Sequence, residues 1–290
     1  MKRPAILAGL CGCEGHSRQG CVTFWKTTGG IFPPVSIPEP AFRLLRRRDP
    51  TPGVSACERQ TDRCPVRSAY RGGVIPDIAS IQLTRVRAHL ILEPELTLID
   101  CGYAGSLPRI RRAIQEHGRS LEELARIICT HGHPDHAGSA RELGAAGVPV
   151  LIHPDDARNL STTWGDVVRR PSRGRIFAAM TPMPRETQPL ENGEILPVLG
   201  GLEVIHTPGH TPGTVCLYGR RDRVLFVGDA LEARFGRVTF ASTLYSDDIA
   251  LARRQVQRLA ALDVGTIIFS HYPALERGAA AVLEGLAARI

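Results

Sequence analysis

A cluster of histidines in the middle of the chain limits its fold more than any other feature. Residues 130–136 have the sequence THGHPDH, which places His131, His133, Asp135 and His136 within six residues. They follow the apolar run 127–129, so the sequence predicts a buried strand that ends in a tight polar loop. Such a loop turns all four side chains toward one point, whereas a helix would spread them over several faces. Imidazole and carboxylate are ligands for zinc, iron and manganese, and the loop therefore predicts a metal site.

Three further candidate ligands lie downstream, and each also follows an apolar strand. His210 comes after the strand predicted at 201–205, Asp229 after 224–227 and His271 after 266–269. We expect these side chains to converge with the histidine loop at one edge of a buried sheet. Asp100 ends another predicted strand, 96–99, upstream of the loop.

These elements together resemble the metallo-β-lactamase fold superfamily, in particular its glyoxalase II-like and lactonase-like branches. The resemblance covers about residues 74–290, with every element in the order that the family has. It implies an α/β fold in which four layers form an αββα sandwich. The stretches that carry it are LIDCG at 98–102, the HGHPDH motif, PGHT at 208–211, GD at 228–229 and SH at 270–271.

The resemblance also implies roles for individual residues. One metal ion takes His131, His133 and His210, the second takes Asp135, His136 and His271, and Asp229 bridges the two. Two Zn²⁺ ions about 3.5–4 Å apart produce a bound hydroxide that attacks a carbonyl, with Asp135 and Asp229 as the catalytic carboxylates. Asp100 is the expected acceptor that fixes a ligand histidine, although it also suits a simple strand-end turn. Tyr272 and Tyr245 are candidates for contacts with the substrate or its oxyanion.

Charge and cysteine content separate the first 73 residues from the rest. The chain has a formal charge of +7, and residues 1–73 hold all of this excess, so residues 74–290 are neutral. A neutral body argues against a nucleic-acid partner. Residues 1–73 also have many prolines, clustered arginines and little periodicity, which predicts a disordered segment or a start-site artefact. A second metal site on the cysteines of this segment is a minor alternative, because their spacing does not match zinc fingers.

Hydrophobic patterning predicts a small-molecule enzyme of the cytoplasm. No apolar run approaches the ~20 residues that cross a bilayer, and the short apolar start lacks a small residue before Cys11, so neither a membrane span nor a signal peptide is expected. Residues 74–290 are predicted to form the catalytic domain, with 155–189 as an insertion or lid and a closing helix over Leu275–Ile290. The sequence does not indicate an oligomeric state.

The predicted reaction is hydrolysis of a small ester, thioester or lactone. Asp229 stands where class B β-lactamases usually have cysteine, and no inserted nucleic-acid-binding domain separates it from His271, so a β-lactamase or a nuclease is less favoured. The main alternative is a persulfide dioxygenase with a single Fe²⁺ on His131, His210 and Asp229. The complete second set of ligands argues against that alternative.

Overall fold

A computed structural model describes residues 77–290 apart from 161, 170–172, 183 and 185. The predictions for residues 1–73 lie outside this range, and the boundary at residue 73 stays a prediction. Every element below belongs to the unit that ends at Ile290.

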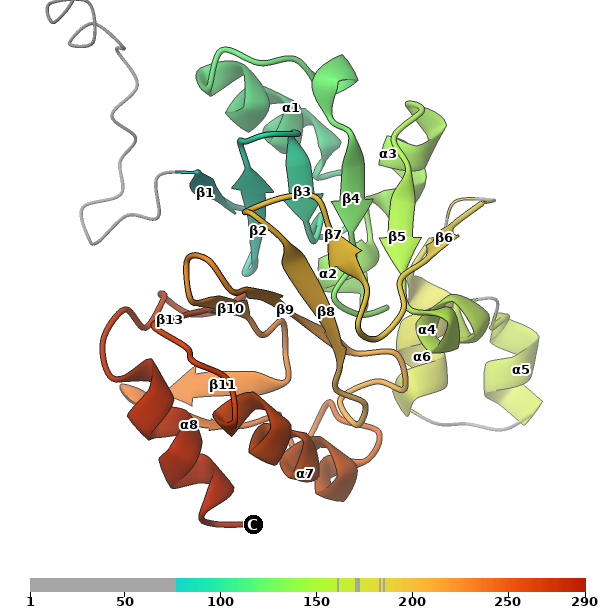
Figure 1. Cartoon of the computed structure of the whole chain (residues 1–290). Coiled ribbons are helices and arrows are strands. Elements are labelled where there is room, and N and C mark those ends of the chain that lie inside the picture. Colours follow the sequence, from blue (N-terminus) through green and yellow to red (C-terminus); the bar gives the residue numbers. More distant parts are fainter. Residues whose placement is uncertain (1–76, 161, 170–172, 183, 185) are drawn as a thin grey trace, which may run out of the picture. The chain divides into compact units, whose positions relative to one another are not determined.

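Two sheets form the centre of the described chain (Figure 1). The first has six strands, in the order β1 (Ile78–Gln82), β2 (Arg87–Ile91), β3 (Thr97–Ile99), β4 (Arg126–Ile128), β5 (Val150–Ile152) and β6 (Gln188–Pro189). Strands β1 to β3 are antiparallel neighbours, whereas β3 to β6 run parallel. The carboxyl ends of β3 and β4 therefore lie side by side, which brings Asp100 next to the histidine loop.

The second sheet brings the late ligand candidates together in the same way. Its order is β13 (Thr266–Ile268), β10 (Val224–Phe226), β9 (Val215–Gly219), β8 (Leu202–His206) and β7 (Ile195–Leu196). Strands β10 and β13 are parallel neighbours, so Asp229 and His271 leave the sheet at the same edge. A separate hairpin, β11 (Leu231–Arg234) with β12 (Arg237–Phe240), follows Asp229 and was not predicted from the sequence.

Alternation along the strands builds the layers. In β4, Ile127 faces the outer helices while its neighbour Ile128 faces the other sheet, and in β10 Leu225 and Phe226 divide in the same way. Helices α1 (Leu107–Glu116) and α3 (Ala140–Ala145) cover the first sheet, and α7 (Ile249–Ala260) and α8 (Ala279–Ala287) cover the second (Figure 1). The predicted four-layer αββα sandwich is confirmed.

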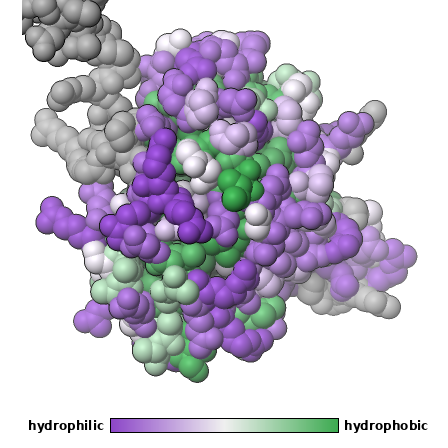
Figure 2. All heavy atoms as spheres, viewed as in Figure 1, coloured by the Kyte–Doolittle hydropathy of each residue, from purple (hydrophilic) through white to green (hydrophobic). Residues whose placement is uncertain are grey.

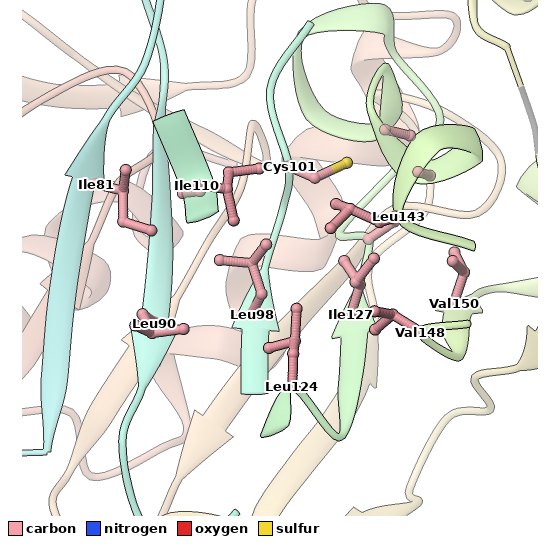
Figure 3. Packing of buried hydrophobic residues seen from close by; sticks show 14 of the residues in the cluster. Ile81, Leu90, Leu98, Cys101, Ile110, Leu124, Ile127, Leu143, Val148 and Val150 are labelled. Carbon is pink, nitrogen blue, oxygen red and sulfur yellow. The ribbon is translucent and has the colours of Figure 1, made fainter. Parts of the chain in front are cut away.

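The outer core beneath α1 and α3 shows how closely these layers pack (Figure 3). Ile110 from α1 and Leu143 from α3 are fully buried over Leu98 and Ile127 of the sheet. Truncating one such side chain to alanine typically costs about 2–5 kcal/mol of unfolding free energy. This packing fixes the strand ends that carry the candidate ligands.

The closing helix is shorter than predicted. Its apolar stripe suggested a helix over Leu275–Ile290, but α8 begins only at Ala279. Gly278 before it has a left-handed φ of +72°, which glycine adopts without a steric penalty, and Leu275 instead pairs with Ile267 beside β13. Pairing of Leu275 with the sheet therefore takes the place of the first turn of the predicted helix.

The segment predicted as an insertion or lid forms helices α4 (Pro154–Asn159), α5 (Trp164–Arg169) and α6 (Arg173–Met180), which lie beside each other at one end of the sandwich (Figure 1). Two short elements complete the described chain, the 3₁₀ turn η2 (Leu121–Glu123) and helix α2 (Pro134–Ala137). The face in Figure 2 is mostly hydrophilic, with hydrophobic side chains gathered near its middle. Within the described range, none of the helices has the length and apolar character that a bilayer crossing needs.

Candidate metal centre

The histidine loop is partly helical, which corrects the sequence prediction of a purely irregular loop. His131 and Gly132 are irregular, but His133 precedes helix α2, which begins at Pro134 and contains Asp135 and His136. Proline suits the first helical position because its fixed φ matches the helix and its missing N–H is not needed there. One helical turn thus sets the directions of Asp135 and His136, and the ring centroids of His136 and His131 lie 4.0 Å apart.

This turn divides the predicted ligands into two groups. The first group is His131, His133, His210 and Asp229, and the second group is Asp135, His136 and His271. Within each group, one nitrogen or oxygen of every side chain lies within 4.8 Å of the others. All seven side chains predicted as metal ligands are therefore brought together.

The side chains of the first group are deeply buried, and its three histidines are uncharged. His210 Nε2 lies 3.0 Å from His133 Nδ1, and all three imidazoles are buried. Burial lowers the pKa of His133 to about 3 and that of His210 to about 4, and it holds the pKa of His131 well below its usual value. Neutral imidazoles present free lone pairs, which is the state in which histidine binds a metal ion.

The second group is more exposed and rich in opposite charge. The side chains of Asp135 and His271 are 20% and 23% exposed, and their Oδ2 and Nε2 atoms are 3.3 Å apart. Burial lowers the pKa of His271, but hydrogen bonds to Asp135 and Asp229 outweigh it and raise that pKa to about 11. Burial also lowers the pKa of His136, but the carboxylates of Asp229, Asp100 and Asp135 outweigh it and raise that pKa to about 9.

Asp229 lies between the two groups. Its Oδ2 atom is 3.5 Å from His210 Nε2 in the first group. Its Oδ1 atom is 3.4 Å from His136 Nε2 and 3.3 Å from His271 Nε2 in the second group. The same histidines hold the pKa of Asp229 well below its usual value despite its burial, so this carboxylate is ionised. One oxygen is thus available to each group.

The donor atoms fit cations at both positions. His131 Nε2 is buried without a hydrogen-bond partner, although an unsatisfied buried polar atom is costly. In the second group His136 Nε2 and His271 Nε2 lie 3.2 Å apart, while the Nδ1 atom of each ring faces an oxygen, of Asp100 and of Arg85 respectively. Both Nε2 atoms therefore point at the same space, where a metal ion would take the place of the protons that the raised pKa values of the two rings imply.

Asp100 is placed where the sequence predicted a supporting acceptor. Its Oδ2 atom accepts a hydrogen bond from His136 Nδ1 at 2.8 Å, and its Oδ1 atom accepts one from the Thr130 backbone N–H at 2.8 Å. Ser270 also donates to it at 3.3 Å. Asp100 is fully buried and has a left-handed φ of +57°, an uncommon backbone conformation for this residue that aims the carboxylate at His136.

Asp156 was missed by the sequence analysis. This carboxylate is 1% exposed and accepts hydrogen bonds from the Gly132 N–H, the Thr211 hydroxyl and the Gly213 N–H, each at 2.7 Å. It therefore joins the loop of His131 and His133 to the turn of His210. Burial raises the pKa of Asp156, which the three hydrogen bonds partly offset. The local signal was its place four residues after a buried strand, which is too weak to select it.

Aromatic side chains lie beside both groups. Tyr245 is 48% exposed, and its ring lies 6.0 Å from that of Phe177, which in turn lies 4.8 Å from His133. Tyr272 packs edge-on against Phe269, 6.2 Å between ring centroids, and its hydroxyl interacts with Arg234. Of the two predicted substrate contacts, Tyr245 thus has the freer ring. Phe177 was not singled out from the sequence.

A third histidine cluster has a different geometry. His153 and His206 stack with ring centroids 3.8 Å apart and ring planes at 15°, beside Asp155. Parallel stacked rings direct their in-plane lone pairs side by side rather than toward one point. His206 Nε2 also bonds the Pro212 carbonyl at 2.8 Å, and the Asp155 N–H bonds His153 Nδ1. This pair packs the His210 turn against α4.

Comparison with curated proteins gives partial matches. The chain is 36% identical over 145 residues to the probable metallo-hydrolase YflN of Bacillus subtilis, which covers 46% of this chain and 54% of that protein. It is 29% identical over 167 residues to the hydroxyacylglutathione hydrolase GloC of Haemophilus influenzae, covering 57% and 74% respectively. The chain spans 60% of the length of YobT of Bacillus subtilis and 48% of the length of a relative from Aquifex aeolicus.

Among solved structures, TTHA1623 in a di-iron-bound form superposes with a TM-score of 0.54 at 27% identity, over 73% of this chain and 96% of that one. The family model described as the metallo-beta-lactamase superfamily matches residues 87–271, which run from strand β2 to the last candidate ligand. With its αββα sandwich and its His and Asp groups at the strand ends, the chain belongs to the metallo-β-lactamase superfamily.

Proposed function

We propose that this protein is a dinuclear metal-dependent hydrolase that cleaves a small ester, thioester or lactone, with zinc as the metal. The observation that carries the proposal is the position of Asp229, whose two carboxylate oxygens face different ligand groups at 3.3–3.5 Å. A carboxylate between two complete groups suits a pair of cations that share it. In this proposal the first group holds one metal, the second group holds the other, and Asp229 bridges them.

Two divalent cations supply a nucleophile at neutral pH by lowering the pKa of water, and they polarise a substrate carbonyl. The chain supplies the orientation. Asp135 is 20% exposed, and although burial raises its pKa, His136 and His271 outweigh this and lower it to about 2. Asp135 is therefore ionised and accepts a hydrogen bond from the attacking water. Asp100 accepts a hydrogen bond from His136 Nδ1 and so directs Nε2 toward the centre.

The tyrosines have separate proposed roles. Tyr245 lies at the exposed side of the centre next to Phe177, where its hydroxyl can donate to the oxygen of a substrate carbonyl as charge develops there. Tyr272, with its hydroxyl against Arg234, is the weaker candidate for this contact. The names of YflN and GloC, a probable metallo-hydrolase and a thioester hydrolase, support hydrolysis as the reaction.

The alternative is a persulfide dioxygenase with one iron on His131, His210 and Asp229. The di-iron form of TTHA1623 shows that a protein of this fold accepts iron. The assembled second group supports two metals over one.

Metal content and substrate turnover of the full-length protein test the proposal. We expect close to two zinc ions per chain by elemental analysis, together with hydrolysis of simple lactones or acyl thioesters. One iron per chain, with oxygen uptake on glutathione persulfide and no hydrolysis, would overturn it.

A further inference from the structure

Exposed apolar side chains gather around the candidate centre. Ten large hydrophobic residues are exposed in the described part of the chain, and isolated ones need no explanation. Five of the ten, however, lie on three segments that each contact a candidate histidine ligand. These five are Tyr103, Ile176, Met180, Leu244 and Tyr245, with exposures between 37% and 53%. Clustered exposed apolar surface commonly marks a binding site.

The first segment is helix α6, which carries Ile176 and Met180. Its Phe177 ring packs on the ring of His133 at 4.8 Å. Just beyond the helix, the Thr181 hydroxyl donates to the Gly132 carbonyl at 3.0 Å. These contacts hold the helix against the histidine loop.

The second segment, 244–245, is held to the turn of His210. Ser246 Oγ lies 3.2 Å from His210 Nδ1, and the Asp247 N–H donates to the His210 carbonyl at 3.0 Å. An N–H of Arg173 at the start of α6 donates to the Leu244 carbonyl at 2.8 Å. The first two segments therefore form one continuous wall.

The third segment contains Tyr103. Two residues earlier, the Cys101 N–H donates to the His136 carbonyl at 2.7 Å, and the Ser139 hydroxyl donates to the Tyr103 carbonyl at 2.7 Å. Asp135, His271 and Tyr245 all act electrostatically on the Tyr103 hydroxyl, which places it on the side of the second group. Two of the three segments therefore adjoin the first group, at His133 and His210, and the third lies beside the second group.

We propose that this apolar rim, consisting of Tyr103, Phe177, Met180, Leu244 and Tyr245, binds the hydrocarbon part of the substrate. The inference rests on the proposed hydrolysis and deepens it, since it names esters and thioesters of apolar acyl groups as the substrate class. The rim side chains carry no charge, so their contacts suit an alkyl or aryl group better than a charged one. They would shield the alkyl or aryl group of the substrate from water, while the substrate carbonyl lies at the metal centre.

The rim is tested by binding of acetate, hexanoate and decanoate to the full-length zinc-loaded protein, measured by isothermal titration calorimetry. We expect the affinity to rise about two- to fourfold for each methylene that the rim covers. Phe177→Ala and Leu244→Ser should each reduce the ratio of decanoate affinity to acetate affinity by about tenfold. Each substitution removes the apolar surface that would cover several methylene groups of the longer chain. Ile195→Ser, which removes an exposed apolar side chain on β7, serves as the matched control and should leave the ratio unchanged.

An affinity that is independent of chain length, or a ratio that Ile195→Ser lowers as much as Phe177→Ala does, overturns the rim. Turnover of acetyl, hexanoyl and decanoyl thioesters by the same protein separates the two proposals. A chain-length gradient in binding without any hydrolysis supports the rim and overturns the proposed reaction. Hydrolysis of all three thioesters at equal KM, with no gradient in binding, supports the reaction and overturns the rim.

Discussion

The two ligand groups lie side by side but are built differently. In the first group, burial keeps the imidazoles of His131, His133 and His210 neutral. In the second group, carboxylates raise the pKa values of His136 and His271 to about 9 and about 11. A metal ion thus enters the first group without displacing protons, whereas it competes with protons at the second. The comparison shows that the two groups of one centre differ in how metal binding depends on pH. The first group is ready to bind a metal ion without losing protons, whereas binding at the second group is linked to the release of protons.

The largest effect is expected from Asp229→Ala. Because this carboxylate faces both groups, its removal should cost the second metal and nearly all turnover while the fold persists. Elemental analysis, initial rates and a thermal melt measure the three effects. Asp263→Ala, which removes a 71% exposed carboxylate paired with Arg223, is the control and should keep both metals. Retention of two metals and full rate in Asp229→Ala would falsify the bridging role.

Lowering the pH should separate the two groups. At the second group, whose histidines stay protonated up to pH values of about 9 and 11 without metal, affinity should fall by about tenfold per pH unit for each proton displaced. At the first group, His133 has a pKa of about 3 and His210 a pKa of about 4. Metal affinity there should change little between about pH 8 and about pH 6. Competition with a chelator at several pH values measures both constants. Equal pH dependence at the two groups contradicts the comparison.

Asp100→Asn should weaken the second group more than the first. The variant loses the carboxylate that orients His136, and changes of this kind typically cost about 10–100-fold in metal affinity. Titration of the metal-free protein with zinc gives the two affinities. Ser270→Ala removes only the 3.3 Å hydrogen bond to the same carboxylate and should cost a few-fold at most. A larger loss in Ser270→Ala than in Asp100→Asn contradicts this role for Asp100.

Asp156→Asn is expected to have the smallest effect and to act on the first group. An asparagine cannot accept at both oxygen positions, so one donor from Gly132, Thr211 or Gly213 loses its partner, at a cost of about 1–3 kcal/mol in unfolding free energy. Urea denaturation of the metal-free protein measures this cost, and zinc titration measures the accompanying loss at the first group. Asp155→Asn, at the neighbouring partly exposed carboxylate, is the control. A loss confined to the second group means that Asp156 does not position the first.

Much of the centre was predictable because its residues have strong local signals. The close spacing of the histidines and the aspartate in the HGHPDH motif is a strong indication of a metal site. The apolar runs before His210, Asp229 and His271 predict strands, so each of these residues could be placed at a strand end. Short apolar strands and amphipathic helices likewise predicted individual elements, because periodicity records which face of an element is buried, and the family resemblance implied their four layers.

By itself, the sequence determined the types of the candidate ligands and the order of the strands that carry them, since both depend on residues close together in the chain. The αββα class followed from the family resemblance that the same motifs carry. Only the tertiary structure decided the geometry of the centre, because the helical turn at Pro134 and the pairing of β10 with β13 set the directions of its side chains. It also decided the parts played by Asp156 and Phe177. Their partners, Gly213 and Tyr245, are distant in sequence, and no local pattern encodes a contact made only when two sheets and an inserted helix pack together.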